Sequence, residues 1–269
     1  MTENGTRASF LRTFWTNAVF APRTSLGFMR IDFVLGTVFV VPLTQMAFFA
    51  LVDQLGGMTN QIAFTAIGNA VATVTYSSVF SVCQTTDHEK EYGTMEHLLV
   101  SPANRAALYV GRGLIPILIS LATVTVGLVY AALFFGAVIP PAHLLAVAAS
   151  VTLTAFAMVG FGLLLGGVAL YLRTSIILGN IFLFVGLLLS GVNFPVSALP
   201  VPLQVLGEAI PLTWGLAAIR SAITGGVTPA LWWLWAAVAV AAAISFAAAL
   251  GLWKVFERRA LATGSIARF

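Results

Sequence analysis

Six long apolar runs, separated by short stretches rich in polar residues, glycine or proline, dominate the chain. A helix needs about 20 apolar residues to cross the hydrocarbon core of a bilayer, which is about 30 Å thick. The pattern therefore predicts one all-α integral membrane domain over residues 1–269, with six transmembrane helices. The predicted spans are 33–52, 60–82, 108–138, 143–171, 175–194 and 230–253.

Composition agrees with this class of protein. Hydrophobic residues make up 59% of the 269 residues and charged residues only 8%, and the mean hydropathy is +0.99. A soluble domain carries about 25% charged residues, so the composition excludes a water-soluble globule. Cys83 is the only cysteine, which excludes a disulfide framework and a cysteine-based metal cluster.

Lysine and arginine are distributed unevenly over the predicted loops. With six spans, both termini share one side of the membrane, and 12 of the 13 basic residues fall on that side, leaving Arg220 for the other. Because cytoplasmic loops collect Lys and Arg, we expect cytoplasmic termini and no nucleic-acid partner. The 12 residues are Arg7, Arg12, Arg23, Arg30, Lys90, Arg105, Arg112, Arg173, Lys254, Arg258, Arg259 and Arg268.

Residues 7–22 differ from a transmembrane span. Phe10, Phe14 and Trp15 recur at helical spacing with polar residues between them, and Pro22 closes the segment. This pattern is typical of an amphipathic helix that lies in the membrane interface, in contact with lipid. Two hypotheses stay open: a simple anchor, or an elbow that passes motion from a cytoplasmic partner to the first span.

Residues 86–102 form the longest predicted cytoplasmic loop and hold four of the nine acidic residues. Tyr92, Met95 and Leu99 fall on one face of a short helix, and Pro102 marks its end. An apolar stripe beside acidic residues suits a helix that docks in a groove of a partner protein, although a solvated loop is the alternative. The histidine and acidic residues of this loop lack the spacing of metal ligands, so we expect no metal site.

Residues 190–228 stay apolar, yet their prolines exclude one continuous helix. We expect short re-entrant helices between the fifth and sixth spans, dipping into the outer leaflet with protein covering the irregular backbone. Glu208 and Arg220 lie near the predicted turns, within reach of water or of each other.

Two motifs carry a resemblance to a known family. The stretch EYGTMEHLLVSP at 91–102 resembles the pattern E-x-G-T-x-E-x-L-L-V-[ST]-P of the ABC-2 type permeases, the membrane subunits of one class of ATP-binding-cassette exporters. The stretch SGVNFP at 190–195, followed by PLTW at 211–214 and by Arg220, is similar to the run that follows the fifth span of that family. This chain departs from the family at Asn193 and Phe194, where aromatic or apolar pairs are common. The resemblance covers essentially the whole chain.

The resemblance implies a membrane pathway formed by two copies of this chain, or by one copy and a close paralogue, above two ABC ATPase subunits. It places the protein in the cell (inner) membrane of a bacterium or archaeon. It implies that residues in the 86–102 loop couple the permease to the ATPase, together with the 7–22 helix, and that the re-entrant segment forms an outer gate. The implied coupling residues are Glu89, Glu91, Tyr92, Gly93, Thr94, Met95, Glu96 and Leu99, and the implied gate residues are Phe194, Pro195, Glu208, Pro211, Trp214 and Arg220.

The chain contains no Gly-x-x-x-x-Gly-Lys-[Ser/Thr] phosphate loop, so we expect a non-enzymatic subunit with no cofactor of its own. ATP and Mg²⁺ would then bind a separate ATPase subunit. An ion-coupled secondary transporter is less favoured, because such proteins place ionisable residues at mid-membrane and the predicted spans hold almost none. An intramembrane enzyme is less favoured still, because no histidine or aspartate shares a membrane depth with Ser77 and Ser78.

Isolated polar residues in aromatic-rich spans are the candidates for the substrate pathway. An uncharged lining of aromatics, hydroxyls and amides suits an amphipathic or lipid-like molecule, and we expect export of a drug, natural product or lipid-linked molecule. A polysaccharide or glycolipid is the alternative. The candidate lining residues are Gln45, Thr73, Tyr76 and Asn180, within a larger set that includes Thr37, Thr44, Asn69 and Thr75.

Overall fold

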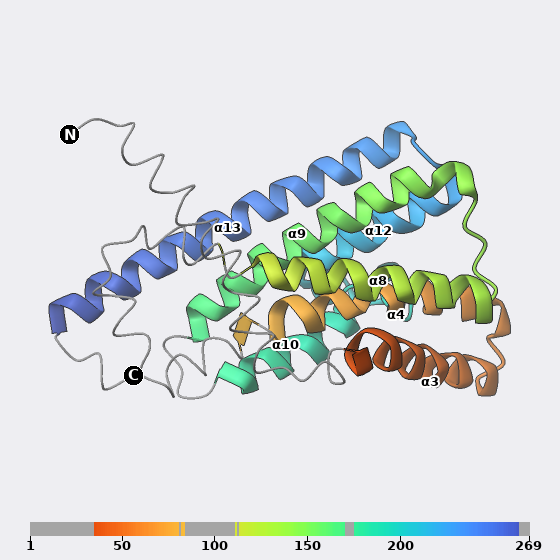
Figure 1. Ribbon diagram of the computed structural model, residues 1–269, viewed down its shortest axis with the longest axis horizontal. Helices are drawn as coiled ribbons and strands as arrows, with labels where there is room; N and C mark the ends of the chain where they lie inside the picture. The colour runs from red at the N-terminus through yellow and green to blue at the C-terminus, as the bar shows by residue number, and fades with distance from the viewer. Residues whose placement is uncertain (1–34, 81, 84–110, 112, 170–174, 264–269) are drawn as a thin grey trace.

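The computed structural model describes residues 35–80, 82–83, 111, 113–169 and 175–263, and every secondary-structure element in these ranges is a helix. The long helices lie roughly along one common axis (Figure 1). Helices suit a membrane domain because they satisfy their backbone hydrogen bonds internally, where lipid offers no partners. The predicted interfacial helix at 7–22 and the predicted coupling loop at 86–102 lie outside the described residues.

The first two predicted spans each combine an α-helix with a π-helical turn. The turn η1 (Gly36–Val40) leads into α3 (Val41–Leu55). A 3₁₀ turn, η2 (Thr59–Gln61), then precedes α4 (Ile62–Thr75), which continues into the π-helical turn η3 (Tyr76–Phe80). Such turns are rare inside α-helices and occur frequently at functional sites.

Three further long helices correspond to the third, fourth and sixth predicted spans. They are α8 (Leu114–Phe134), α9 (Leu144–Ala169), which follows the short turn η4 (Pro141–His143), and α13 (Pro229–Thr263). The last runs well beyond the apolar stretch predicted to end at residue 253. Its 35 residues correspond to about 52 Å of helix.

The fifth predicted span, 175–194, ends earlier than the apolar pattern indicates. The helix α10 (Ser175–Leu189) has 15 residues, about 22 Å of helix, because the chain turns at Gly191 with φ of 77° and reaches a proline four residues later. Three short helices follow: η5 (Val196–Ala198), α11 (Val201–Glu208) and α12 (Pro211–Gly225). Their re-entry into a membrane leaflet stays a prediction.

Five segments are long and apolar enough to cross a membrane by length and composition, and α10 is a shorter apolar helix. The chain is therefore a multi-pass membrane protein, while the count of six spans stays a prediction. The five segments are Gly36–Leu55, Thr59–Val79, Leu114–Phe134, Pro141–Ala169 and Pro229–Phe256.

The helix α4 lies at the centre of the bundle and packs against α3, α8, α9, α10 and α12. Small side chains on α4 allow this close approach, as in other membrane helix interfaces. At Gly127 of α8, an added Cβ would lie 2.8 Å from the Cβ of Ala70, so the contact between α4 and α8 requires glycine there. The helix α12 is also buried along one face, between α9 and α13.

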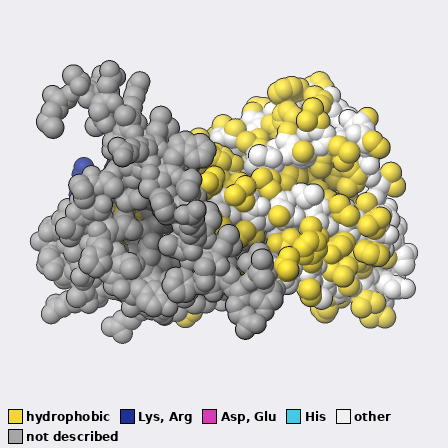
Figure 2. All heavy atoms as spheres, viewed as in Figure 1, with side chains coloured by type: hydrophobic (Ala, Val, Ile, Leu, Met, Phe, Trp, Pro, Cys, Tyr) yellow, Lys and Arg dark blue, Asp and Glu magenta, His cyan; other side chains and the backbone are white. Residues whose placement is uncertain are grey.

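The outer surface of the bundle is apolar. Hydrophobic side chains cover much of the described surface on the face drawn in Figure 2, and large residues such as Phe184 and Trp233 are 70% and 72% exposed. A soluble protein rarely leaves so much apolar area in water, whereas lipid accepts it. Trp232 and Trp233 begin α13, where exposed tryptophans are typical of the membrane–water interface.

Candidate functional site

A cavity of about 400 Å³ lies between α3, α4 and α10, with the turn after α10 and one residue of α8 completing its wall. Both π-helical turns contribute to it. Its lining includes no charged side chain within the described ranges, and the larger part of that lining is apolar. The lining residues are Thr37, Val41, Gln45, Phe49, Ala72, Thr73, Tyr76, Ser77, Thr123, Leu183, Phe184, Leu187, Leu188 and Asn193.

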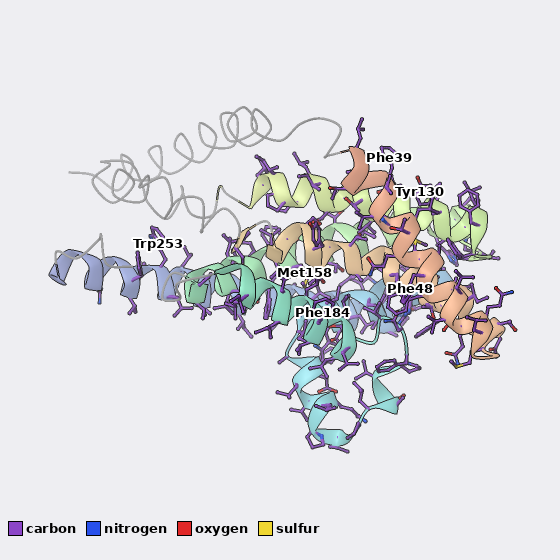
Figure 3. All side chains as sticks on the ribbon, turned by 90° about the horizontal axis from the view of Figure 1, so that it is seen from below. Phe39, Phe48, Tyr130, Met158, Phe184 and Trp253 are labelled. Carbon is purple, nitrogen blue, oxygen red and sulfur yellow. The ribbon has the colours of Figure 1, made fainter. Side chains whose placement is uncertain are left out.

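The apolar part of the cavity opens toward the surface between α3 and α10. The α3 residues that line it recur every four positions, so one helical face is turned to the cavity. Phe184 and Leu188 of α10 line it while remaining 70% and 50% exposed. Figure 3 shows α3 and α10 on the same side of the molecule, with Phe48 and Phe184 on their outer faces. The cavity is therefore accessible from the side that these two helices share.

Hydroxyl groups on the cavity wall are already hydrogen-bonded inside the protein. Thr73 donates to the Ala70 carbonyl at 2.7 Å, and Thr123 donates to the Ile119 carbonyl at 2.7 Å. The Ser77 hydroxyl lies 2.8 Å from the hydroxyl of Ser120 on α8, which also lies 3.1 Å from that of Ser78. These serines join α4, η3 and α8, as membrane hydroxyls commonly do.

Three carboxamide side chains form a hydrogen-bonded chain at one end of the cavity. Gln45 of α3 donates its Nε2 to Oδ1 of Asn69 at 3.0 Å. Asn69 of α4 is fully buried and donates its Nδ2 to the Thr65 carbonyl at 2.9 Å and to Oδ1 of Asn193 at 2.8 Å. Asn193 belongs to the turn after α10, so the chain links three separate parts of the fold.

Arg220 of α12 holds this turn against α4. Its guanidinium donates to the carbonyls of Gly191 at 2.8 Å and Val192 at 3.1 Å, and to the carbonyl of Phe64 on α4 at 3.0 Å. The same group lies 3.4 Å from the centroid of the Phe64 ring, a cation–π geometry. Gly68 leaves the necessary space, because a Cβ there would lie 2.0 Å from the Val192 carbonyl oxygen.

The structure brings three of the four predicted pathway residues to the cavity. Gln45, Thr73 and Tyr76 line it. Asn180 does not, because it is exposed on the outer face of α10, one helical turn from Ile177 and Phe184, which are also exposed.

Within the described residues, hydrogen bonds connect only two of the predicted gate residues to each other, Trp214 and Glu208. Pro211 is the first residue of α12, a position that suits proline. The Trp214 indole donates to the Glu208 carbonyl at 2.7 Å, which satisfies one of the orphan carbonyls at the end of α11. Glu208 and Phe194 have no side-chain bond to the others within the described residues, and Arg220 binds backbone carbonyls instead of a carboxylate.

Sequence reasoning did not assign the partnership of Asn69 with Asn193. Asn69 appeared only as an isolated polar residue of the second span, and Asn193 only as a departure from the family pattern. The available signal for each residue was its polar side chain within an apolar run. Their contact could not be predicted from this signal, because Asn69 and Asn193 are 124 positions apart in the sequence.

Comparison with known proteins supports the class of the chain. No curated protein sequence matches it, whereas the profile described as "ABC-2 type transporter" matches residues 9–224. This match covers most of the chain and includes the cavity, the turn after α10 and α12. It confirms the resemblance indicated by the two motifs. The chain therefore belongs to the ABC-2 type transporter family and is a permease component of an ABC transporter.

Proposed function

We propose that this chain is the membrane subunit of an exporter that moves amphipathic or lipid-like molecules, such as drugs, natural products or lipid-linked molecules, out of the cytoplasm. The observation that carries this proposal is the uncharged cavity between α3, α4 and α10. Its volume of about 400 Å³ lies within the range of pockets for small organic ligands.

The lining favours an amphipathic substrate over a polysaccharide. Phe49, Phe184 and three leucines provide apolar surface, and Thr73 and Thr123 already donate their hydroxyl hydrogens to backbone carbonyls. A sugar polymer needs many hydrogen-bonding partners along its path, because unpaired polar groups are costly to bury. The described wall therefore supports a glycan substrate less well than an amphipathic one, and a glycan is the alternative substrate.

We propose that a separate ABC ATPase supplies the energy. Among the residues that the structure describes, no carboxylate, histidine, lysine or arginine lines the cavity, so this part of the wall offers no group for coupling to protons or ions. Members of this family work with ABC ATPase subunits, which would bind the ATP and Mg²⁺. The 7–22 helix and the 86–102 loop, with the coupling residues Glu89 to Leu99 named above, are the proposed contacts with that subunit.

The proposed orientation places the termini in the cytoplasm of a bacterial or archaeal cell. In support, the connections after α3, α8 and α12 lie together at one end of the bundle (Figure 1) and contain no lysine or arginine. Lys254 and Arg258 lie toward the other end of α13. Positive charge favours the cytoplasmic side, so the basic end of α13 would face the ATPase.

We propose that two copies of the chain pack across the face formed by α3 and α10. Ile181 and Phe184 are 57% and 70% exposed on α10, and Phe48 is 61% exposed on α3. Asn180 lies on the same apolar face of α10, and an amide in such a place is a typical hydrogen-bonding contact between membrane helices. A second copy placed there would close the open side of the cavity.

Transport by everted membrane vesicles that contain the chain and its ATPase tests the proposed function. ATP should drive accumulation of a neutral amphipathic probe such as N-octylbenzamide. Vesicles with an ATPase variant unable to hydrolyse ATP provide the control. Equal accumulation with and without ATP hydrolysis would contradict the proposal.

A further inference from the structure

We propose that Gln45 and Asn193 form an acceptor–donor pair that selects neutral amphipathic molecules in which an N–H or O–H group adjoins a carbonyl, as in a secondary amide. This inference rests on the proposed function, because it takes the cavity to be part of the pathway. It goes further by assigning the chemical class of the substrate to two named side chains.

One backbone carbonyl fixes the orientation of all three carboxamides. The Thr65 carbonyl can only accept, so Asn69 must turn its Nδ2 toward it. The second hydrogen of that nitrogen then requires the Oδ1 atom of Asn193 as its acceptor. The remaining Asn69 oxygen requires the Nε2 atom of Gln45 as its donor. No alternative amide orientation satisfies all three contacts.

This orientation leaves two polar atoms available at the cavity. Asn69 is fully buried and uses its oxygen and both amide hydrogens. Gln45 and Asn193 are only half-buried and line the cavity, and within the described residues no bond occupies Oε1 of Gln45 or Nδ2 of Asn193. The two lining carboxamides therefore keep an unused acceptor, Oε1 of Gln45, and an unused donor, Nδ2 of Asn193, and both side chains bond to the same partner, Asn69.

The pair matches a neutral group that both donates and accepts. The N–H of a secondary amide would donate to Gln45 Oε1 while its carbonyl accepts from Asn193 Nδ2. Phe49, Phe184 and Leu187 would contact the apolar remainder of the molecule. A permanent ion would lose its hydration with no opposite charge in the lining, which is unfavourable at this depth.

Arg220 and Gly68 act as positioning residues for the donor. Arg220 binds the carbonyls of Gly191 and Val192 immediately before Asn193. Gly68, adjacent to Asn69, lets the Val192 carbonyl approach α4. The backbone next to Asn193 is thus fixed by buried contacts. Because this donor is already positioned, binding costs less conformational entropy.

Three probes of similar size test the selectivity of the pair. Tritiated N-octylbenzamide has the donor and the acceptor, N-methyl-N-octylbenzamide lacks the N–H, and benzyldimethyloctylammonium carries a fixed positive charge. Equilibrium binding is measured on the full chain in lipid nanodiscs, without ATP. We expect the secondary amide to bind about tenfold more tightly than its N-methyl form, the factor for one net hydrogen bond of about 1.4 kcal/mol. The ammonium probe should bind most weakly.

Variants assign this preference to the two side chains. Gln45→Leu removes the acceptor and should lower the affinity for the secondary amide about tenfold, to the affinity of the N-methyl form. The affinity for the N-methyl form should not change in this variant. Asn193→Leu removes the donor and should weaken both amides. Thr125→Val is the control, because Thr125 is exposed on α8, is not one of the lining residues and donates to the Leu121 carbonyl of its own helix. Gln45→Met replaces Gln45→Leu if the latter folds poorly.

Equal binding of the two amides to the wild-type chain, or no measurable binding of either, overturns the inference. An unchanged preference in Gln45→Leu overturns it as well. Because binding is measured without ATP, this outcome is distinct from a failure of the proposed function. If the chain prefers the secondary amide but shows no ATP-driven accumulation, the selective pair is supported and the exporter function is contradicted. If ATP drives transport but the chain shows no preference, the exporter function is supported and the selective pair is contradicted.

Discussion

Single polar residues decide how the turn after α10 meets the rest of the bundle. Asn69 and Arg220 each reach into it from a different helix, and the two contacts lie on consecutive residues of the turn. The sequence indicated that these residues were unusual in an apolar context. It could not indicate their partners, because the tertiary fold decides which groups lie within hydrogen-bonding distance of a buried polar side chain. The sequence placed Glu208 and Arg220 within reach of water or of each other, whereas in the structure the Arg220 guanidinium donates to three backbone carbonyls.

Replacing Arg220 by alanine should destabilise the protein, because three carbonyl oxygens in a poorly hydrated site lose their donor. We expect a loss of about 3 kcal/mol and a fall in the melting temperature of about 6–12 °C, measured by thermal unfolding in lipid nanodiscs. Arg258→Ala is the control, because that side chain is exposed near the end of α13. An unchanged melting temperature for Arg220→Ala would show that the guanidinium does not hold the turn.

A methyl group at Gly68 should displace the turn from α4. The added Cβ would lie 2.0 Å from the Val192 carbonyl oxygen, and the backbone must move, which separates Asn193 from Asn69. We expect Gly68→Ala to lower the melting temperature and to weaken N-octylbenzamide binding. Gly251→Ala is the matched control, since nothing lies within 4 Å of its added Cβ, and alanine there should stabilise α13 by up to about 1 kcal/mol. Similar effects of the two substitutions would contradict the proposed contact.

At the scale of elements, hydropathy located the long helices because lipid requires about 20 apolar residues for each crossing. The same signal failed at the end of the fifth span, where residues 190–194 were assigned to the span but are not helical. A glycine in a left-handed conformation ends the regular backbone there. The signal also missed the extension of α13, because a helix continues through charged residues once it leaves the apolar phase. Its length depends on backbone propensity and contacts, which hydropathy does not measure.

The outer face of α10 should meet its counterpart in a second copy. In a Cys83→Ser background, Ile181→Cys is expected to give a disulfide-linked dimer on mild oxidation in native membranes. Val240→Cys is the control, because Val240 is equally exposed, at 57%, but lies on α13. Dimer formation through Val240→Cys with none through Ile181→Cys would place the contact between copies on a different face.

At the scale of the whole molecule, the family and the membrane class follow from patterns spread over the chain. Motifs after the second and fifth spans indicated an ABC-2 permease, and the profile match at 9–224 confirms it. The cavity was only partly predictable. Its walls combine one face each of α3 and α10 with the central α4, and helix faces come together only after packing. Its uncharged character, in contrast, was already indicated by the low charge content of the spans.

The predicted coupling loop should connect ATP hydrolysis to transport. Tyr92→Ala and Met95→Ala remove apolar side chains from the proposed docking stripe in residues 86–102. We expect a reconstituted complex with the ATPase to lose most ATP-driven accumulation of N-octylbenzamide while the chain still inserts into the membrane. Insertion is measured by membrane fractionation and transport by vesicle accumulation. Normal transport by both variants would show that the loop does not couple the two subunits.

ATP-driven uptake by purified components tests most directly whether an ABC ATPase drives transport through this chain. The full chain and its ABC ATPase are reconstituted in liposomes with the ATPase outside, and N-octylbenzamide accumulation is followed after ATP and Mg²⁺ are added. We expect accumulation that requires both proteins and falls in Gln45→Leu, while Thr125→Val retains it. Accumulation without the ATPase, or none with both proteins present, would contradict an ATP-driven pathway through the cavity between α3, α4 and α10.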